Sequence, residues 1–92
     1  MKRISLLPVM DRDAVSLLAP ELREAFQSGA AVTIVADRVD QIGQAGLQLV
    51  LSATRSAAAA GVDLLIEAPS PAFLAAADLA GLRSHMPLPP AA

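Results

Sequence analysis

Two short apolar segments, each bounded by residues that end regular structure, place the strongest limit on the fold of this chain. Residues 31–36 (Ala-Val-Thr-Ile-Val-Ala) are rich in β-branched side chains, which is typical of a buried strand. Residues 62–67 (Val-Asp-Leu-Leu-Ile-Glu) have a similar apolar character. Between them, residues 46–60 carry apolar side chains at helical spacing and end at Gly61. Two buried strands joined through a helix predict parallel pairing in an α/β domain with a right-handed crossover.

Three further segments complete the predicted order of elements. Residues 4–7 form a short apolar run before a proline and are expected to be the first strand. A helix follows, and we expect Ser16 to be its N-cap, because Pro20 would then lie in the first turn. A start at Asp13 would instead place Pro20 inside the helix. A third helix is expected over residues 72–79.

The last part of the chain is rich in proline. Three prolines occur within residues 83–92, and proline lacks the N–H group that regular pairing needs. We therefore expect a single domain over residues 1–82, followed by a disordered tail over residues 83–92. His85 lies in this tail, so we do not expect it to take part in catalysis.

The composition excludes several kinds of chemistry. The chain has no cysteine and one histidine, which excludes disulfides, cysteine nucleophiles and multi-histidine metal sites within the chain. Its formal net charge is −2 and it has no basic run, which argues against nucleic acid as a partner. We expect no catalytic residue, no metal and no cofactor. An enzyme would have to use Asp37, Asp40 or His85.

No segment of the sequence is typical of a signal peptide or a membrane span. The apolar stretch 4–10 is short, contains a proline and lacks a small-residue cleavage pattern. The longest uncharged run, residues 41–54, is shorter than the roughly 20 residues that cross a bilayer. We therefore expect a cytoplasmic, soluble protein with no direct membrane insertion.

The most distinctive loop joins the second strand to the second helix. In open α/β sheets, ligands and partners meet the carboxyl ends of the strands, where residues 37–46 lie. We interpret Gly43 and Gly46 as allowing a tight turn and close helix packing; anion binding at the helix start is the alternative. A polar stripe follows one face of the helix: Gln44, Gln48, Ser52 and Arg55.

The order of the motifs matches that of a known family. The segment 40–51 contains Gly-Gln-Ala-Gly-Leu-Gln-Leu at the predicted helix start, and Ala-Pro-Ser-Pro-Ala-Phe occupies residues 68–73. With Leu-Ala-Pro-Glu-Leu-Arg-Glu-Ala at 18–25, these segments resemble the STAS domain of sulfate transporters and anti-sigma-factor antagonists, over roughly residues 4–82. The resemblance implies a non-enzymatic protein-binding module with a small mixed β-sheet of about four strands and helices packed on it.

The chain departs from the family at one functional motif. In sigma-regulating members this loop reads aspartate, serine, serine or threonine, glycine, and a partner kinase phosphorylates the first serine. Here Gly43 replaces the aspartate, Gln44 the phosphorylated serine and Ala45 the next residue, while Gly46 is kept. Because Gln44 has no hydroxyl group, we expect no phosphorylation at this position.

The motifs look most like single-domain STAS proteins that accompany bacterial chemotaxis kinases. We expect a regulator of a chemotaxis-type histidine kinase; the alternatives are an accessory STAS subunit of a phospholipid-transport ABC complex or an anti-sigma-factor antagonist. Each implies a protein partner, either a kinase or an ATPase of a bacterial regulatory or transport system. The expected partner-binding residues are Asp40, Ile42, Gly43, Gln44, Ala45, Gly46, Gln48, Ser52 and Arg55.

Overall fold

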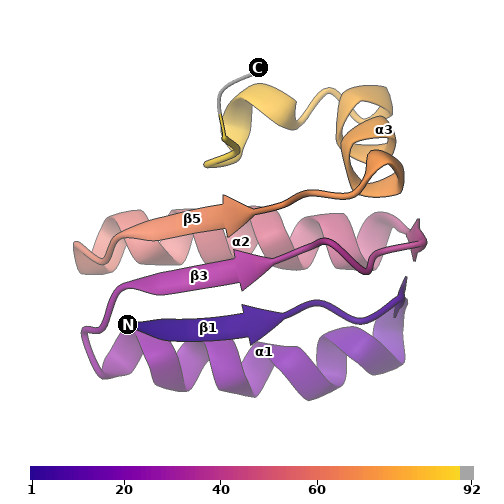
Figure 1. Ribbon diagram of the computed structural model, residues 1–92. Coiled ribbons are helices and arrows are strands. Elements are labelled where there is room, and N and C mark those ends of the chain that lie inside the picture. Colours follow the sequence, from indigo (N-terminus) through magenta and orange to yellow (C-terminus); the bar gives the residue numbers. More distant parts are fainter. Residues whose placement is uncertain (90–92) are drawn as a thin grey trace.

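The computed structural model describes residues 1–89 of the chain. Three parallel strands form its central sheet (Figure 1). The strands are β1 (Lys2–Ser5), β3 (Val32–Val35) and β5 (Leu64–Glu67), in the order β1-β3-β5. Their register places Ile4, Ile34 and Ile66 side by side. All three isoleucines are buried, so this row lies in the core of the molecule.

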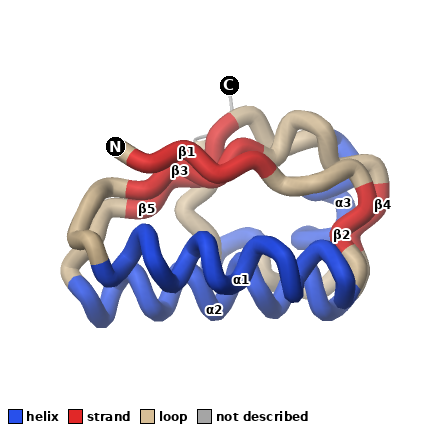
Figure 2. Tube along the Cα trace, turned by 90° about the horizontal axis from the view of Figure 1, so that it is seen from below, coloured by secondary structure: helices blue, strands red, loops and turns tan. Residues whose placement is uncertain are grey.

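Two long helices cover one face of this sheet (Figure 2). They are α1 (Arg12–Gln27) and α2 (Gln44–Ala60). Leu18 and Leu22 of α1 and Val50 of α2 are buried in the same core as the strands. A shorter helix, α3 (Pro71–Leu79), follows β5 and lies beyond the carboxyl ends of the strands (Figure 1).

A second, smaller sheet lies near the carboxyl ends of the main strands (Figure 2). It consists of β2 (Val9–Met10) and β4 (Gln41–Ile42), which pair in parallel. The sequence does not predict these strands, because two residues are too few to show an alternating pattern and Pro8 precedes the first of them.

The expected α/β class is confirmed, with helices packed on a small sheet. We expected one mixed sheet of about four strands. Among residues 1–89 the strands instead divide into a three-stranded and a two-stranded sheet, and every pairing is parallel. The pairings are parallel because each pair of neighbouring strands is joined through a crossover that contains a helix.

The first helix begins earlier than predicted. Asp11, not Ser16, is its N-cap, and the Asp11 side chain accepts a hydrogen bond of 3.0 Å from the backbone N–H of Ala14. The prediction of Ser16 is therefore wrong, and Pro20 lies inside the helix. Both Ser16 and Pro20 are exposed, so water can satisfy the Ser16 carbonyl that Pro20 leaves without a donor.

The chain beyond residue 82 also differs from the expectation of a disordered tail. Arg83–His85 form one turn of 3₁₀-helix, and the Met86 side chain is buried in the core. The backbone N–H of Ile66 donates to the Pro87 carbonyl at 3.0 Å, so this segment covers the outer edge of β5. Although proline cannot donate to a strand, its carbonyl still accepts. Residues 90–92 of the predicted tail lie outside the described residues.

Candidate functional site

The loop that leads into α2 is tied to the segment before α1. The backbone N–H groups of Asp40 and Gln41 both donate to the Pro8 carbonyl, at 2.8 and 3.0 Å. The pairing of β2 with β4 continues from this point. Val39 is buried between the exposed residues Arg38 and Asp40. The exposed side chains of the loop are therefore held in a defined position on the domain.

Gly46 allows α2 to lie directly against the β2–β4 sheet. A Cβ atom at this position would lie 2.7 Å from Cγ1 of Ile42 and 2.9 Å from the carbonyl oxygen of Met10. These distances are too short for any side chain, so the packing requires glycine. The prediction of close helix packing is confirmed for Gly46. Because Gly46 is buried, it adds no side chain to the surface, but it sets how closely α2 approaches the β2–β4 sheet.

The second helix begins at Gln44, two residues before the predicted start. Gly43 is its N-cap in an extended conformation, and the first-turn N–H groups have no side-chain acceptor there. A Cβ atom on Gly43 would meet nothing within 4 Å. Gln44 and Gln48, one helical turn apart, are both exposed.

Ser70 connects the loop after β3 to the start of α3 through hydrogen bonds. Its hydroxyl group donates to the Val39 carbonyl at 2.6 Å and accepts from the backbone N–H of Phe73 at 3.1 Å. Its own backbone N–H donates to the Ala36 carbonyl at 3.1 Å. Ser70 is buried and is the N-cap of α3. The Pro-Ser-Pro motif thus positions α3 beside the loop.

An open groove of about 420 Å³ lies between the start of α2 and α3. Gln44, Leu47 and Gln48 line it from α2, and Leu79 and Leu82 line it from the other side. Leu79 is 92% exposed. Leu79 therefore adds an exposed apolar side chain to a groove whose opposite wall carries the amide groups of Gln44 and Gln48.

A second groove, of about 450 Å³, lies on the other side of the α2 start. It is lined by residues of β2, the start of α1, β4 and the start of α2, including Arg12 and Gln41. Ile42, Gly43 and Gln44 line both grooves. The first turn of α2 therefore forms the ridge that separates them.

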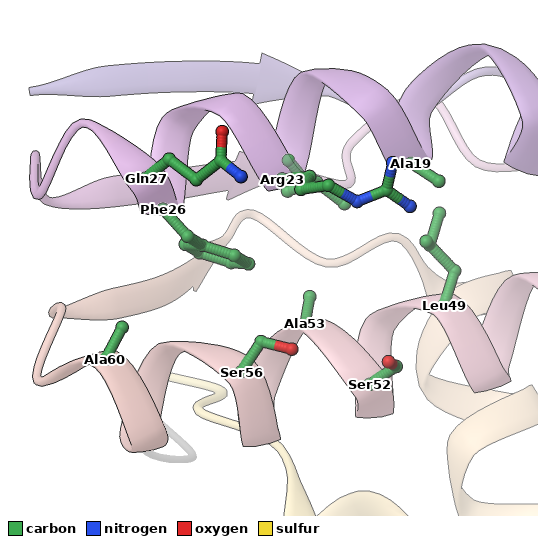
Figure 3. Close-up of a pocket in the computed structure, with 10 residues that line it drawn as sticks. Ala19, Arg23, Phe26, Gln27, Leu49, Ser52, Ala53, Ser56 and Ala60 are labelled. Carbon is green, nitrogen blue, oxygen red and sulfur yellow. The ribbon is translucent and has the colours of Figure 1, made fainter.

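The structure brings most of the predicted partner-binding residues together at this ridge. Asp40 is exposed on the loop before it. Four of the predicted residues line the second groove: Ile42, Gly43, Gln44 and Ala45. Ser52 does not join them, because it lines a different groove, between α1 and α2 (Figure 3). Arg55 is exposed one turn further along α2 than Ser52.

Leu79 is a surface residue that the sequence pattern does not single out. Nothing in the alanine-rich segment around it distinguishes an exposed leucine from a buried one, because alanine is compatible with both faces of a helix. Its position depends on how α3 is set beyond the sheet, which the Ser70 contacts decide.

Residues 43–48, at the ridge itself, carry no charged side chain. Within residues 1–89 the two ion pairs lie elsewhere and join Arg3 to Glu67 and Arg83 to Asp78. The hydrogen bonds from Arg3 to Glu67 lower the pKa of that carboxyl.

The described part of the chain has no group of three or more acidic or histidine side chains placed to hold a metal. None of its helices combines the length and apolar character needed to cross a membrane.

Comparisons with known proteins identify the family and the fold of the chain. The family model described as "Mlab, STAS domain" matches residues 2–89. The chain is also similar to the structure of the anti-sigma factor antagonist SpoIIAA in its unphosphorylated form, with 21% sequence identity and a TM-score of 0.74 over 96% of this chain and 78% of that one. No curated protein matches. The structural likeness shows a shared fold, and since the family match spans nearly every residue, the chain belongs to the STAS family.

Proposed function

We propose that this STAS domain is a cytoplasmic, non-catalytic module that docks on a protein partner through the start of α2. The position of Gln44 carries the proposal. This side chain is exposed on the ridge between two open grooves, and the backbone beneath it is fixed by the Pro8 hydrogen bonds and the Gly46 packing. Open grooves on a fixed ridge suit a complementary protein surface, because a small substrate would need an enclosing pocket.

The proposed docking does not use phosphorylation at the ridge. Residues 43–46 contain no hydroxyl group. Gln44 is neutral, whereas a phosphoserine would carry a charge of about −1.5 to −2. We therefore expect docking to depend on the partner's own state, because residues 43–46 have no side chain that phosphorylation could modify.

The motifs favour a chemotaxis-type histidine kinase as the partner. A module that binds one conformation of a kinase more tightly than another shifts the population toward that conformation, and so changes activity without taking part in the reaction. The accessory subunit of a phospholipid-transport ABC complex and the anti-sigma-factor antagonist would use the same surface on a different partner.

Affinity capture from the native cells tests this proposal. The tagged chain is compared with a Gln44→Arg bait, and proteins enriched only by the unchanged chain are identified by mass spectrometry. A receptor-coupled histidine kinase supports the proposal in full. Capture of an ABC ATPase or an anti-sigma kinase would support the docking role but assign a different partner. Equal capture of every protein by both baits would contradict docking at the α2 start.

A further inference from the structure

A third groove lies between α1 and α2, on the face of the helices turned away from the sheet. Its volume is about 350 Å³. Figure 3 shows Phe26 pointing from α1 into the space between the helices, with Leu49 and Ala53 pointing into it from α2. Small side chains, including Ala19 and Ala60, line the groove along its length and keep it open. The floor of the groove between these two adjacent helices is therefore apolar.

The groove holds one of the two aromatic residues of the chain. Phe73 is fully buried in the core, whereas Phe26 is half-buried and lines the groove. Aromatic side chains are enriched at the centre of protein interfaces. Phe26 also packs against the core, so its ring is held in place while part of it faces the groove.

The charge along the groove has one sign. Arg23 is the charged residue among those that line the groove. The other polar lining residues are neutral: Gln27, Ser52 and Ser56. Among residues 1–89 Arg23 takes part in neither ion pair.

The neighbouring acidic residues of α1 do not line this groove. Glu21 and Glu24 lie about 160° and about 100° around the helix from Arg23, at 100° per residue. Neither carboxylate lines the groove. The groove thus offers one exposed cation above an apolar floor, which is complementary to an anionic, amphipathic segment.

We propose that this groove binds an amphipathic helical segment of a partner protein, with apolar side chains against Phe26 and Leu49 and a carboxylate beside Arg23. The space between two adjacent helices accepts a third helix, whose side-chain ridge fills it. This surface is separate from the ridge at the α2 start, and it gives the domain a second point of contact with a partner.

A synthetic peptide of about 15 residues is a suitable probe, with leucines along one helical face and glutamates flanking them. The same peptide with lysine in place of glutamate is the matched control. Addition of the acidic peptide to the full chain should shift the backbone NMR signals of Leu22, Phe26, Leu49 and Ala53. The lysine peptide should cause smaller shifts at the same concentration.

Charge-reversal variants locate the contact. Arg23→Glu should weaken binding of the acidic peptide by about fivefold. Lys2→Glu makes the same change in net charge on β1 and should leave the affinity unchanged. Ser56→Glu, on the α2 rim of the groove, gives a second variant at an exposed position and should also weaken binding.

Several results would overturn this inference. They are equal binding of the two peptides, equal affinity of Arg23→Glu and Lys2→Glu, absence of shifts at millimolar peptide, or shifts confined to residues 40–48. Concentration-dependent shifts without peptide would assign the groove to a second copy of this chain and would also contradict it. Gln44→Arg should bind the peptide normally, so failure at one surface is distinguishable from failure at the other.

Discussion

At the scale of single residues, two glycines three positions apart act in different ways at the start of α2. Gly46 is enclosed, and the atoms nearest to a hypothetical Cβ include the Met10 carbonyl oxygen, which is backbone and cannot rotate away. Gly43 has open space around it and serves as a helix cap without a side chain. The short spacing of the two glycines at one helix start suggests a shared role, but the structure gives each of them a separate physical reason.

Replacement of Gly46 tests the close approach of α2 to the β2–β4 sheet. Gly46→Ala gains about 1 kcal/mol of helix propensity, but overpacking against Met10 and Ile42 costs about 1–3 kcal/mol. We therefore expect a lower free energy of unfolding in urea. Gly43→Ser has room and provides a better cap, so it should raise that free energy by a few tenths of a kcal/mol. A more stable Gly46→Ala protein would contradict the packing described for Gly46.

At the scale of elements, Ser70 connects the loop after β3 with α3. Its hydroxyl group both caps the helix and satisfies the Val39 carbonyl. The position of α3 fixes Leu79, and with it one wall of the groove beside Gln44. A change at Ser70 should therefore alter the docking surface as well as the stability of the domain.

Ser70→Ala should lower the free energy of unfolding by about 1–3 kcal/mol, because a helix loses its cap and a buried carbonyl loses its donor. Ser16→Ala is the matched control: Ser16 is exposed within α1, and its replacement should change stability by less than about 0.5 kcal/mol. Hydrogen exchange should also become faster at the start of α3. Equal stability of the two variants would show that the Ser70 hydrogen bonds contribute nothing.

The sequence predicts the long elements better than the short ones. Apolar spacing and Gly61, which has a left-handed conformation, mark the end of α2 correctly. The sequence pattern does not predict β2 and β4, because their pairing depends on hydrogen bonds from Asp40 and Gln41 to the Pro8 carbonyl, which is distant in sequence. The sequence predicts too late a start for α1, because Pro20 favours a start close before it, whereas its exposed position makes it tolerable inside the helix.

The sequence predicts the loop of the candidate site but not its full surroundings. Gln44 and Gln48 follow from helical spacing, and both are exposed. Ser52 shares their spacing but faces the groove toward α1, because successive members of the stripe drift around the helix. The contribution of Leu79 comes from α3, whose placement beside α2 is a tertiary property that spacing along one helix cannot reveal.

At the scale of the whole molecule, the last described residues complete the core. Met86 is 7% exposed and belongs to the same apolar cluster as the strands and helices. The neighbouring Pro87 carbonyl accepts from Ile66 at the edge of β5. Residues 83–89 therefore act as part of the domain, and the family match also extends to residue 89.

Met86→Ala should lower the free energy of unfolding by about 2–3 kcal/mol, because it removes a buried side chain from a small core. Leu79→Ala truncates an apolar side chain that is 92% exposed and should change stability by less than about 0.5 kcal/mol. Urea unfolding of the two variants checks this difference. If Met86→Ala were as stable as Leu79→Ala, the terminal segment would not contribute to the core.

The central claim is that the domain binds its partner through the ridge at the start of α2. The most direct test is calorimetric measurement of the affinity for the captured partner with Gln44→Arg and with Ala59→Arg, which adds the same side chain at an exposed position near the other end of α2. We predict that Gln44→Arg weakens binding at least about tenfold, which corresponds to about 1.4 kcal/mol, while Ala59→Arg binds like the unchanged chain. Both variants should unfold at the same urea concentration as the unchanged protein. Unchanged affinity of a folded Gln44→Arg protein would contradict the account.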